Sequence, residues 1–239
     1  YVICLDNTST VINPNLITFF PNPPIDTQLS PLEYTFQWYN GTEAEVNSNP
    51  NRVIINGETS STYTPTSIGF YTVVATNIAT GCRIPATTEV VGSYPPEQIT
   101  VNLVSQTFSE NNIIEVDVIG IGDYEFRLDN GPWQREPRFE QVTGGEHIVY
   151  VRDLLNCNEI SQIQFVIDYP RHFTPNNDGY PDTWNIKGMS SQHKSLVSIF
   201  DRYGKLLKQL NPLGNGWDGT FNGEKLPSSD YWFVVEYQE

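Results

Sequence analysis

The stretch Glu33-Tyr-Thr-Phe-Gln-Trp-Tyr39 decides the fold of the first part of the chain. Apolar and polar residues alternate along it, and it ends in the turn pair Asn40-Gly41. Alternation with a period of two is typical of a strand with one buried face, and Asn-Gly is a strong turn signal. Trp38 stands in the middle of the stretch, so we expect it in a hydrophobic core.

Further short strands follow at the spacing of a β-sandwich. Arg52-Val-Ile-Ile55 precedes the turn pair Asn56-Gly57, and a longer run covers 61–76. Within that run, Gly69-Phe-Tyr-Thr-Val-Val-Ala75 resembles the strand F region of Ig-like and polycystic-kidney-disease-type domains. The resemblance implies that Tyr71 braces a corner of the sandwich.

A second segment of the same style follows the proline-containing linker 92–96. Alternating runs at 99–104, 114–118, 124–128 and 147–153 are separated by glycine-rich turns, and helical periodicity is absent. The segment resembles the repeats of giant gliding-motility adhesins. The residues that carry this resemblance are Gly120, Gly122, Tyr124, Phe126, Leu128, Asp129, Gly131 and Trp133, followed by Gly145, Val149, Val151, Arg152, Asp153 and Cys157.

The third segment contains strand signals at 197–200, 205–210 and 231–237, with turns between them. The chain is therefore predicted to be all-β, with three tandem small β-sandwich (Ig-like) domains. We place them at 1–93, 94–169 and 170–239.

Composition limits the classes of partner. The formal net charge is −15 and the pI is about 4.4, so the chain repels nucleic acid, which we exclude as a partner. No run approaches the roughly 20 apolar residues of a membrane-spanning helix, and we expect no membrane-spanning segment.

The three cysteines show no zinc-site spacing. Cys4 and Cys82 bracket the first domain, and we predict a disulfide that joins its first and last strands. The alternative is that both are small buried apolar residues. Cys157 is expected to be a free thiol.

Four motifs in the third segment resemble the gliding motility-associated C-terminal domain, which is the type B sorting domain of type IX secretion. They are Phe173-Thr-Pro-Asn-Asn-Asp-Gly-Tyr-Pro-Asp-Thr-Trp184, Ile199-Phe-Asp-Arg-Tyr-Gly-Lys-Leu206, Gly216-Trp-Asp-Gly-Thr220 and Leu226-Pro-Ser-Ser-Asp-Tyr-Trp-Phe233. Asn177 replaces the usual first glycine, and Pro181 stands where Asn is usual. Family members continue beyond this point, so we expect the domain to lack its last strand.

The acidic loop of this segment is the one candidate metal site. Asn176, Asp178 and Asp182 place oxygen atoms at alternating positions around Gly179, an arrangement that suits Ca²⁺. The alternative is a hydrogen-bonded Asx turn that begins the domain. No other cofactor is expected.

Aromatic residues near the end of the chain are the candidate partner contacts. Trp217 and Asp218 lie in a turn, where the alternative for Trp217 is a lid over one end of the sandwich. Tyr231, Trp232 and Phe233 are consecutive, so both faces of that strand are aromatic. One face fills the core and the other requires a cover.

The resemblance implies a secretion, sorting and surface-anchoring region of a large bacterial cell-surface protein, exported by the type IX system. The implied partners are the type IX translocon and an outer-membrane β-barrel protein, and the upstream domains would be spacers. The alternative is an adhesin whose first two sandwiches bind carbohydrate or protein. We expect no enzyme, because the sequence contains no nucleophile motif and its histidines (His147, His172 and His193) lie in separate segments.

Overall fold

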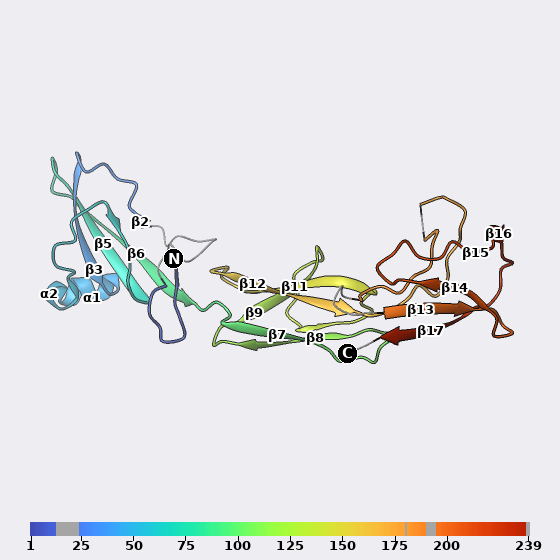
Figure 1. Cartoon of the computed structure of the whole chain (residues 1–239). Coiled ribbons are helices and arrows are strands. Elements are labelled where there is room, and N and C mark those ends of the chain that lie inside the picture. The colour runs from blue at the N-terminus through green and yellow to red at the C-terminus, as the bar shows by residue number, and fades with distance from the viewer. Residues whose placement is uncertain (13–23, 180, 190–194, 238–239) are drawn as a thin grey trace. The chain divides into compact units, whose positions relative to one another are not determined.

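The computed structural model describes residues 1–12, 24–179, 181–189 and 195–237 (Figure 1). The chain forms two compact units. Unit 1 contains residues 1–99, 118–126 and 151–160, and unit 2 contains residues 100–117, 127–150 and 161–239. Each unit thus draws strands from separate stretches of the sequence.

A four-stranded sheet in the order β1-β6-β5-β3 organises the N-terminal part of unit 1. Its strands are β1 (Val2–Cys4), β3 (Tyr34–Asn40), β5 (Gly69–Asn77) and β6 (Arg83–Ser93). β3, β5 and β6 pair antiparallel, whereas β1 pairs parallel with the end of β6, with Cys4 opposite Ser93. A short ladder joins β2 (Ile25–Asp26) to β4 (Thr62–Tyr63).

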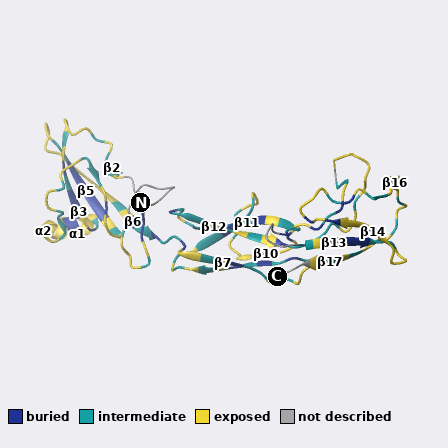
Figure 2. Ribbon diagram, viewed as in Figure 1, coloured by how far each residue is buried: buried dark blue, intermediate teal, exposed yellow. Residues whose placement is uncertain are grey.

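The core of this region contains the aromatic residues that the sequence indicated. Trp38 is 1% exposed, stacks on Tyr63 with ring centroids 5.4 Å apart, and donates from Nε1 to the Ser60 carbonyl. The Tyr71 hydroxyl donates to the Ser67 carbonyl at 3.0 Å, which confirms its role as a corner brace. β3 and β5 carry much of the buried surface (Figure 2).

Residues 43–53 form two short helices, whereas the sequence pattern predicted a strand at 52–55. These are α1 (Glu43–Ser48) and α2 (Pro50–Val53). Thr42 and Glu45 form a capping box that satisfies amides of the first turn, and Pro50 occupies the first turn of α2, where its missing N–H costs nothing. Ile54 alone makes an isolated bridge to β3.

The predicted Cys4–Cys82 disulfide is wrong, because Cys4 bonds to Cys157, 153 residues away. β1 pairs with Val91–Ser93 at the end of β6, whereas Cys82 lies in the turn just before β6 begins. A strand of that length separates the two positions by roughly 30 Å. Cys82 is the exposed free cysteine, and Cys157 is buried.

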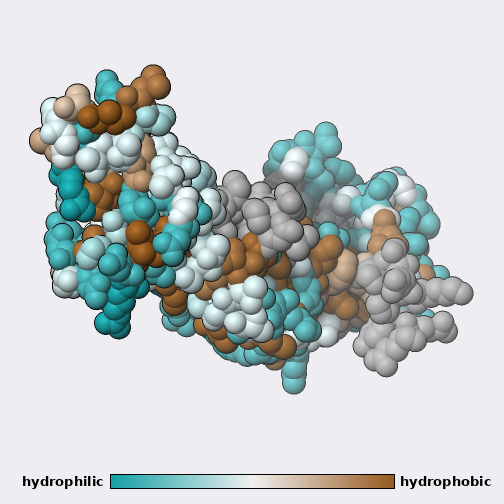
Figure 3. Space-filling view, turned by 90° about the vertical axis from the view of Figure 1, so that its left-hand side faces the viewer, coloured by the Kyte–Doolittle hydropathy of each residue, from teal (hydrophilic) through white to brown (hydrophobic). Residues whose placement is uncertain are grey.

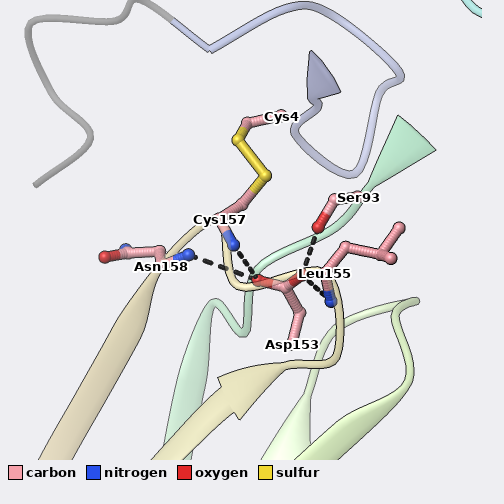
Figure 4. Close-up of a disulfide and its surroundings, with 6 residues drawn as sticks. All are labelled: Cys4, Ser93, Asp153, Leu155, Cys157 and Asn158. Carbon is pink, nitrogen blue, oxygen red and sulfur yellow. Dashed lines mark hydrogen bonds between the residues drawn. A yellow bond between two sulfur atoms is a disulfide. The ribbon is translucent and has the colours of Figure 1, made fainter. Parts of the chain in front are cut away.

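Asp153 organises the backbone around this disulfide (Figure 4). Its Oδ1 accepts hydrogen bonds from the amides of Cys157 (2.8 Å) and Asn158 (3.2 Å). Its Oδ2 accepts from the Leu155 amide (3.0 Å) and from the Ser93 hydroxyl. One buried carboxylate therefore joins the end of β6 to the loop that carries Cys157.

The middle of the chain forms two three-stranded sheets, in the orders β10-β8-β7 and β12-β11-β9. Their strands are β7 (Gln98–Leu103), β8 (Ile114–Ile119), β9 (Tyr124–Leu128), β10 (Arg138–Phe139), β11 (Gly145–Asp153) and β12 (Glu159–Val166). Gly122 approaches the Tyr94 carbonyl so closely that a Cβ would lie 2.2 Å from it, which explains a glycine at this position of the repeat-like motif.

Two cross-strand contacts fix the outer side of β9 against β11. Arg152 donates from Nε to Glu125 at 2.6 Å. The Arg127 guanidinium lies over the rings of Trp133 and Tyr150, at 4.7 and 4.3 Å from their centroids. Arginine stacked between aromatic rings is a favourable cation–π arrangement.

The C-terminal part of unit 2 contains a sheet in the order β14-β13-β17 and a small β15-β16 ladder. The strands are β13 (Ser195–Phe200), β14 (Leu206–Leu210), β15 (Thr220–Phe221), β16 (Glu224–Lys225) and β17 (Trp232–Tyr237). The buried core beneath the sheet consists of Trp184, Ile186, Met189, Val197, Ile199, Leu210 and Trp217.

The all-β fold class is confirmed, since strands and small sheets make up most of the ordered elements. The division into three domains stays a prediction. Within the described ranges, no helix is long and apolar enough to cross a membrane. Hydrophobic and hydrophilic residues lie side by side on the face displayed in Figure 3.

Candidate partner-binding surface

The loop that opens the C-terminal domain is held by one carboxylate. Asp182 accepts hydrogen bonds at Oδ1 from the amides of Asn176 (3.1 Å) and Asn177 (2.5 Å), and at Oδ2 from the Gly179 amide (3.1 Å). Asn177 takes a positive φ of 62°, which asparagine tolerates better than most residues. The replacement of the usual glycine is therefore compatible with the turn.

The three candidate calcium ligands lie together in this loop. Asn176 donates from Nδ2 to Asp178 at 2.8 Å, and its Oδ1 accepts from the Asp178 amide at 3.1 Å. Hydrogen bonds of this kind are typical of an Asx turn, which is the alternative to a calcium site in this loop. Over the described ranges no group of three or more His, Cys, Asp or Glu side chains is arranged to hold a metal. Calcium binding by this loop stays a prediction.

Trp217 is a core residue, with 2% of its surface exposed. Its ring packs edge-on against Tyr231 at 5.0 Å and lies 5.7 Å from Phe173. Its Nε1 donates to the Thr220 carbonyl at 2.8 Å, and its backbone pairs with Trp184. This environment agrees with the alternative interpretation of Trp217 as a lid over one end of the sandwich. Little of its ring surface is accessible to a partner.

Asp218, the next residue, is exposed and shapes the turn. Its Oδ1 accepts from the Thr220 hydroxyl (2.8 Å) and amide (3.1 Å). These hydrogen bonds, that of the hydroxyl first, lower the pKa of the Asp218 carboxyl. The carboxylate is thus held ionised beside the buried tryptophan.

Residues 231–233 divide between the two faces of β17, as the alternation requires. The Tyr231 hydroxyl donates to the Pro227 carbonyl at 2.6 Å, and its ring packs on the core. Phe233 also faces inward, with ring centroids 4.7 Å from Tyr169 and 5.0 Å from Trp184. Trp232 faces outward and is 67% exposed.

An apolar row crosses the outward face of the sheet at Trp232. Phe200 of β13 pairs directly with Trp232 of β17 on one side and with Leu206 of β14 on the other. Leu206 is 45% exposed, and Val234, on the same face as Trp232, is 48% exposed. A sheet with one solvated face normally presents polar residues there, whereas this row is apolar and exposed.

β17 borders a cleft of about 860 Å³. The aromatic residues that line it are Tyr169, Phe173, Trp184, Trp217, Tyr231, Trp232 and Phe233. The polar atoms of Trp184, Trp217 and Tyr231 are bonded to backbone carbonyls. The walls therefore combine aromatic rings with polar and charged side chains, among them Arg171, Lys225 and Asp230.

Sequence reasoning missed two residues of this region. Phe108 and Tyr169 pack on the C-terminal core, although Phe108 comes from the connection between β7 and β8. No short-range pattern marks Phe108, because it stands alone between polar neighbours. Only the tertiary structure identifies it.

Comparison with known proteins supports the assignment of the C-terminal segment. Residues 167–239 match the model of the CHU_C Type IX secretion signal domain, which is not an enzymatic family. A search of curated proteins gave no match.

Two solved structures show weak likeness. Fibronectin(III)-like modules of Clostridium thermocellum CbhA are 16% identical, with 69% of this chain and 88% of that chain covered and a TM-score of 0.34. Dimeric latent PorU from Porphyromonas gingivalis is 15% identical, with 100% of this chain and 31% of that chain covered and a TM-score of 0.24. At these scores neither likeness supports an argument.

The family match and the four motifs coincide in the same residues, and a secretion signal implies interaction with the type IX machinery and a secreted or cell-surface fate. The chain therefore carries, at residues 167–239, a CHU_C type IX secretion signal domain.

Proposed function

We propose that this chain is the sorting and surface-anchoring region of a larger bacterial cell-surface protein, with its upstream β-domains as spacers. The type IX signal at 167–239 is the observation that carries the sorting role. The translocon and an outer-membrane β-barrel protein are the proposed partners.

The outward face of β14-β13-β17 is the proposed contact surface, with Trp232 as its anchor. Trp232, Leu206 and Val234 are exposed on this face, and tryptophan is enriched among the residues that dominate binding energy. In the described part of the chain, β17 is also the edge strand of its sheet, which suits addition of a partner strand.

The adhesin alternative receives less support. In the described residues of 1–169, the exposed aromatic side chains are Phe70 (44%) and Phe165 (37%). Trp38 is buried, and Trp133 is engaged with Arg127. A carbohydrate platform normally needs exposed rings, so these residues favour the spacer role.

The test is export of a fluorescent reporter fused ahead of the full chain, in a bacterium that has the type IX system. We expect the fusion in the medium or on the cell surface, and inside the cells of a strain without the translocon. Trp232→Ala should reduce export, whereas Phe70→Ala, at an exposed aromatic position of unit 1, should not. Equal retention of the wild-type fusion in both strains would refute the sorting role.

A further inference from the structure

Phe108 completes the core of the secretion signal from outside the matched segment 167–239. It lies between β7 and β8, and its ring packs edge-on against Tyr169 (5.5 Å) and Phe233 (5.8 Å). Tyr169 and Phe233 themselves lie 4.7 Å apart. The three rings therefore touch one another, and edge-to-face contacts of this kind are favourable beyond the area that they bury.

The backbone at Phe108 is fixed to the signal domain by Arg171. Its Nη2 donates to the carbonyls of Phe108 (3.3 Å) and Ser109 (2.9 Å), and its guanidinium lies 4.1 Å from the Tyr169 ring centroid. Phe108 has a φ of 62°, which is uncommon for a bulky residue and is retained only where the surroundings impose it. The connection is thus held in one conformation against the domain.

A second contact joins the same connection to the start of the signal domain. Asn112 is 3% exposed and donates from Nδ2 to the Asp168 carboxylate (3.0 Å) and to the Val142 carbonyl (3.1 Å). A Cβ at Gly144 would lie 2.7 Å from Cβ of Asp168, so the backbones are in close contact there. Residues 100–117 and 161–239 accordingly belong to one compact unit.

We propose that Phe108 is a positioning residue of the export signal. Phe108 holds Phe233 inward, and adjacent strand residues point to opposite faces, so the same contact fixes Trp232 outward on the proposed partner surface. The signal that the machinery recognises then includes the β7–β8 connection that carries Phe108, and not residues 167–239 alone. This inference rests on the proposed function.

The test uses the full-chain reporter fusion with Phe108→Ala. Removal of the ring should leave β17 less firmly held and reduce the exported fraction by about fivefold or more, since one or two kcal/mol changes a conformational ratio by a factor of about 5 to 30. The matched control is Phe139→Ala. Phe139 is also a buried phenylalanine of unit 2, but it lies in β10 and pairs with Ile114.

We expect Phe139→Ala to be exported like the wild type at equal cellular amounts, and Phe108→Leu, which keeps an apolar side chain, to recover most of the export. Normal export of Phe108→Ala would overturn the proposal. An equal loss with Phe139→Ala would also overturn it, because general destabilisation would then explain the defect. If the wild-type fusion itself stays inside the cell, the sorting role fails instead.

Hydrogen exchange on the purified full chain gives a readout that does not depend on export. The amides of β17 should exchange about 5 to 30 times faster in Phe108→Ala than in the wild type, with β11 unchanged. Unaltered exchange in β17 would overturn the positioning role. If Phe108→Ala does not accumulate, Arg171→Lys keeps the ring and the charge but loses the paired carbonyl contacts, and it should show the same pattern more weakly.

Discussion

Two joints hold distant stretches of this chain together. One is covalent and the other consists of packed aromatic rings. The disulfide joint of unit 1 consists of Cys4, Cys157, Asp153 and Ser93. The aromatic joint of unit 2 consists of Phe108, Tyr169, Phe233 and Arg171. A disulfide needs an oxidising compartment, whereas packed rings need none. The aromatic joint can therefore form before the cysteines are oxidised, whereas the disulfide joint is complete only after their oxidation.

The largest expected effect is at the aromatic joint, with Trp184→Ala. This ring is 8% exposed and packs against both Tyr169 and Phe233. Its loss should lower the free energy of unfolding by about 3–5 kcal/mol, measured by urea denaturation followed by circular dichroism. Trp232→Ala is the control and should stay within about 0.5 kcal/mol of the wild type. Equal losses in the two variants would contradict the assignment of inner and outer faces.

The next effect is at the disulfide joint, with Cys157→Ser. The bond spans 153 residues, and removal of such a cross-link typically costs about 2–4 kcal/mol. We expect the thermal midpoint to fall by roughly 5–15 °C, and a reducing agent to have the same effect on the wild type but none on the variant. Cys82→Ser, at the exposed free cysteine, should leave the midpoint unchanged. A comparable fall with Cys82→Ser would indicate a different pairing.

A smaller effect separates the covalent and polar parts of the same joint. Asp153→Asn replaces one acceptor oxygen by a donor that faces backbone amides and the Ser93 hydroxyl. An unsatisfied buried group costs about 1–3 kcal/mol, so calorimetry should show a lower midpoint with the disulfide intact. Asp123→Asn, on the exposed surface, is the control. A loss as large as that of Cys157→Ser would mean that the carboxylate, and not the bond, dominates the joint.

The smallest expected effect concerns the loss of thermal stability at acidic pH. Burial opposes ionisation of Asp129, but hydrogen bonds from the Ile148 amide and the His147 side chain outweigh it and lower the pKa of its carboxyl. Such a group contributes stability above its unfolded pKa of about 4, and this stability is lost as the pH falls through the lower folded pKa. Thermal midpoints measured from pH 6 to 2 should therefore fall less steeply in Asp129→Asn than in the wild type. An unchanged slope in Asp129→Asn would contradict a lowered pKa of the Asp129 carboxyl in the folded protein.

Local patterns predicted the strands well, because alternation is a property of neighbouring residues. The stretch 33–39 corresponds to β3, Trp38 is buried, and Tyr71 braces its corner. The same reading missed α1, although Thr42 and Glu45 form a capping box that was visible in the sequence. The strand predicted at 52–55 is instead the end of α2, followed by an isolated bridge at Ile54.

The joints were not predictable, because each depends on a long-range arrangement. The partner of Cys4 is fixed by the parallel pairing of β1 with the end of β6, which no cysteine spacing reveals. Trp217 was predicted to be either a partner contact or a lid over one end of the sandwich, and only the packing of its turn over the core decides between the two. Phe108 has no local pattern at all and is explained only by the rings that surround it.

The bond between Cys4 and Cys157 also determines how the chain responds to force. A pull applied between Tyr1 and the C-terminal domain passes from residue 4 to residue 157 through one covalent link. The chain between them, whose extended length is about 500 Å, is kept out of the line of tension. A cell-surface protein with this link would resist stretching in its first two-thirds as long as the bond stays oxidised, and any force-induced lengthening would come from the residues beyond 157.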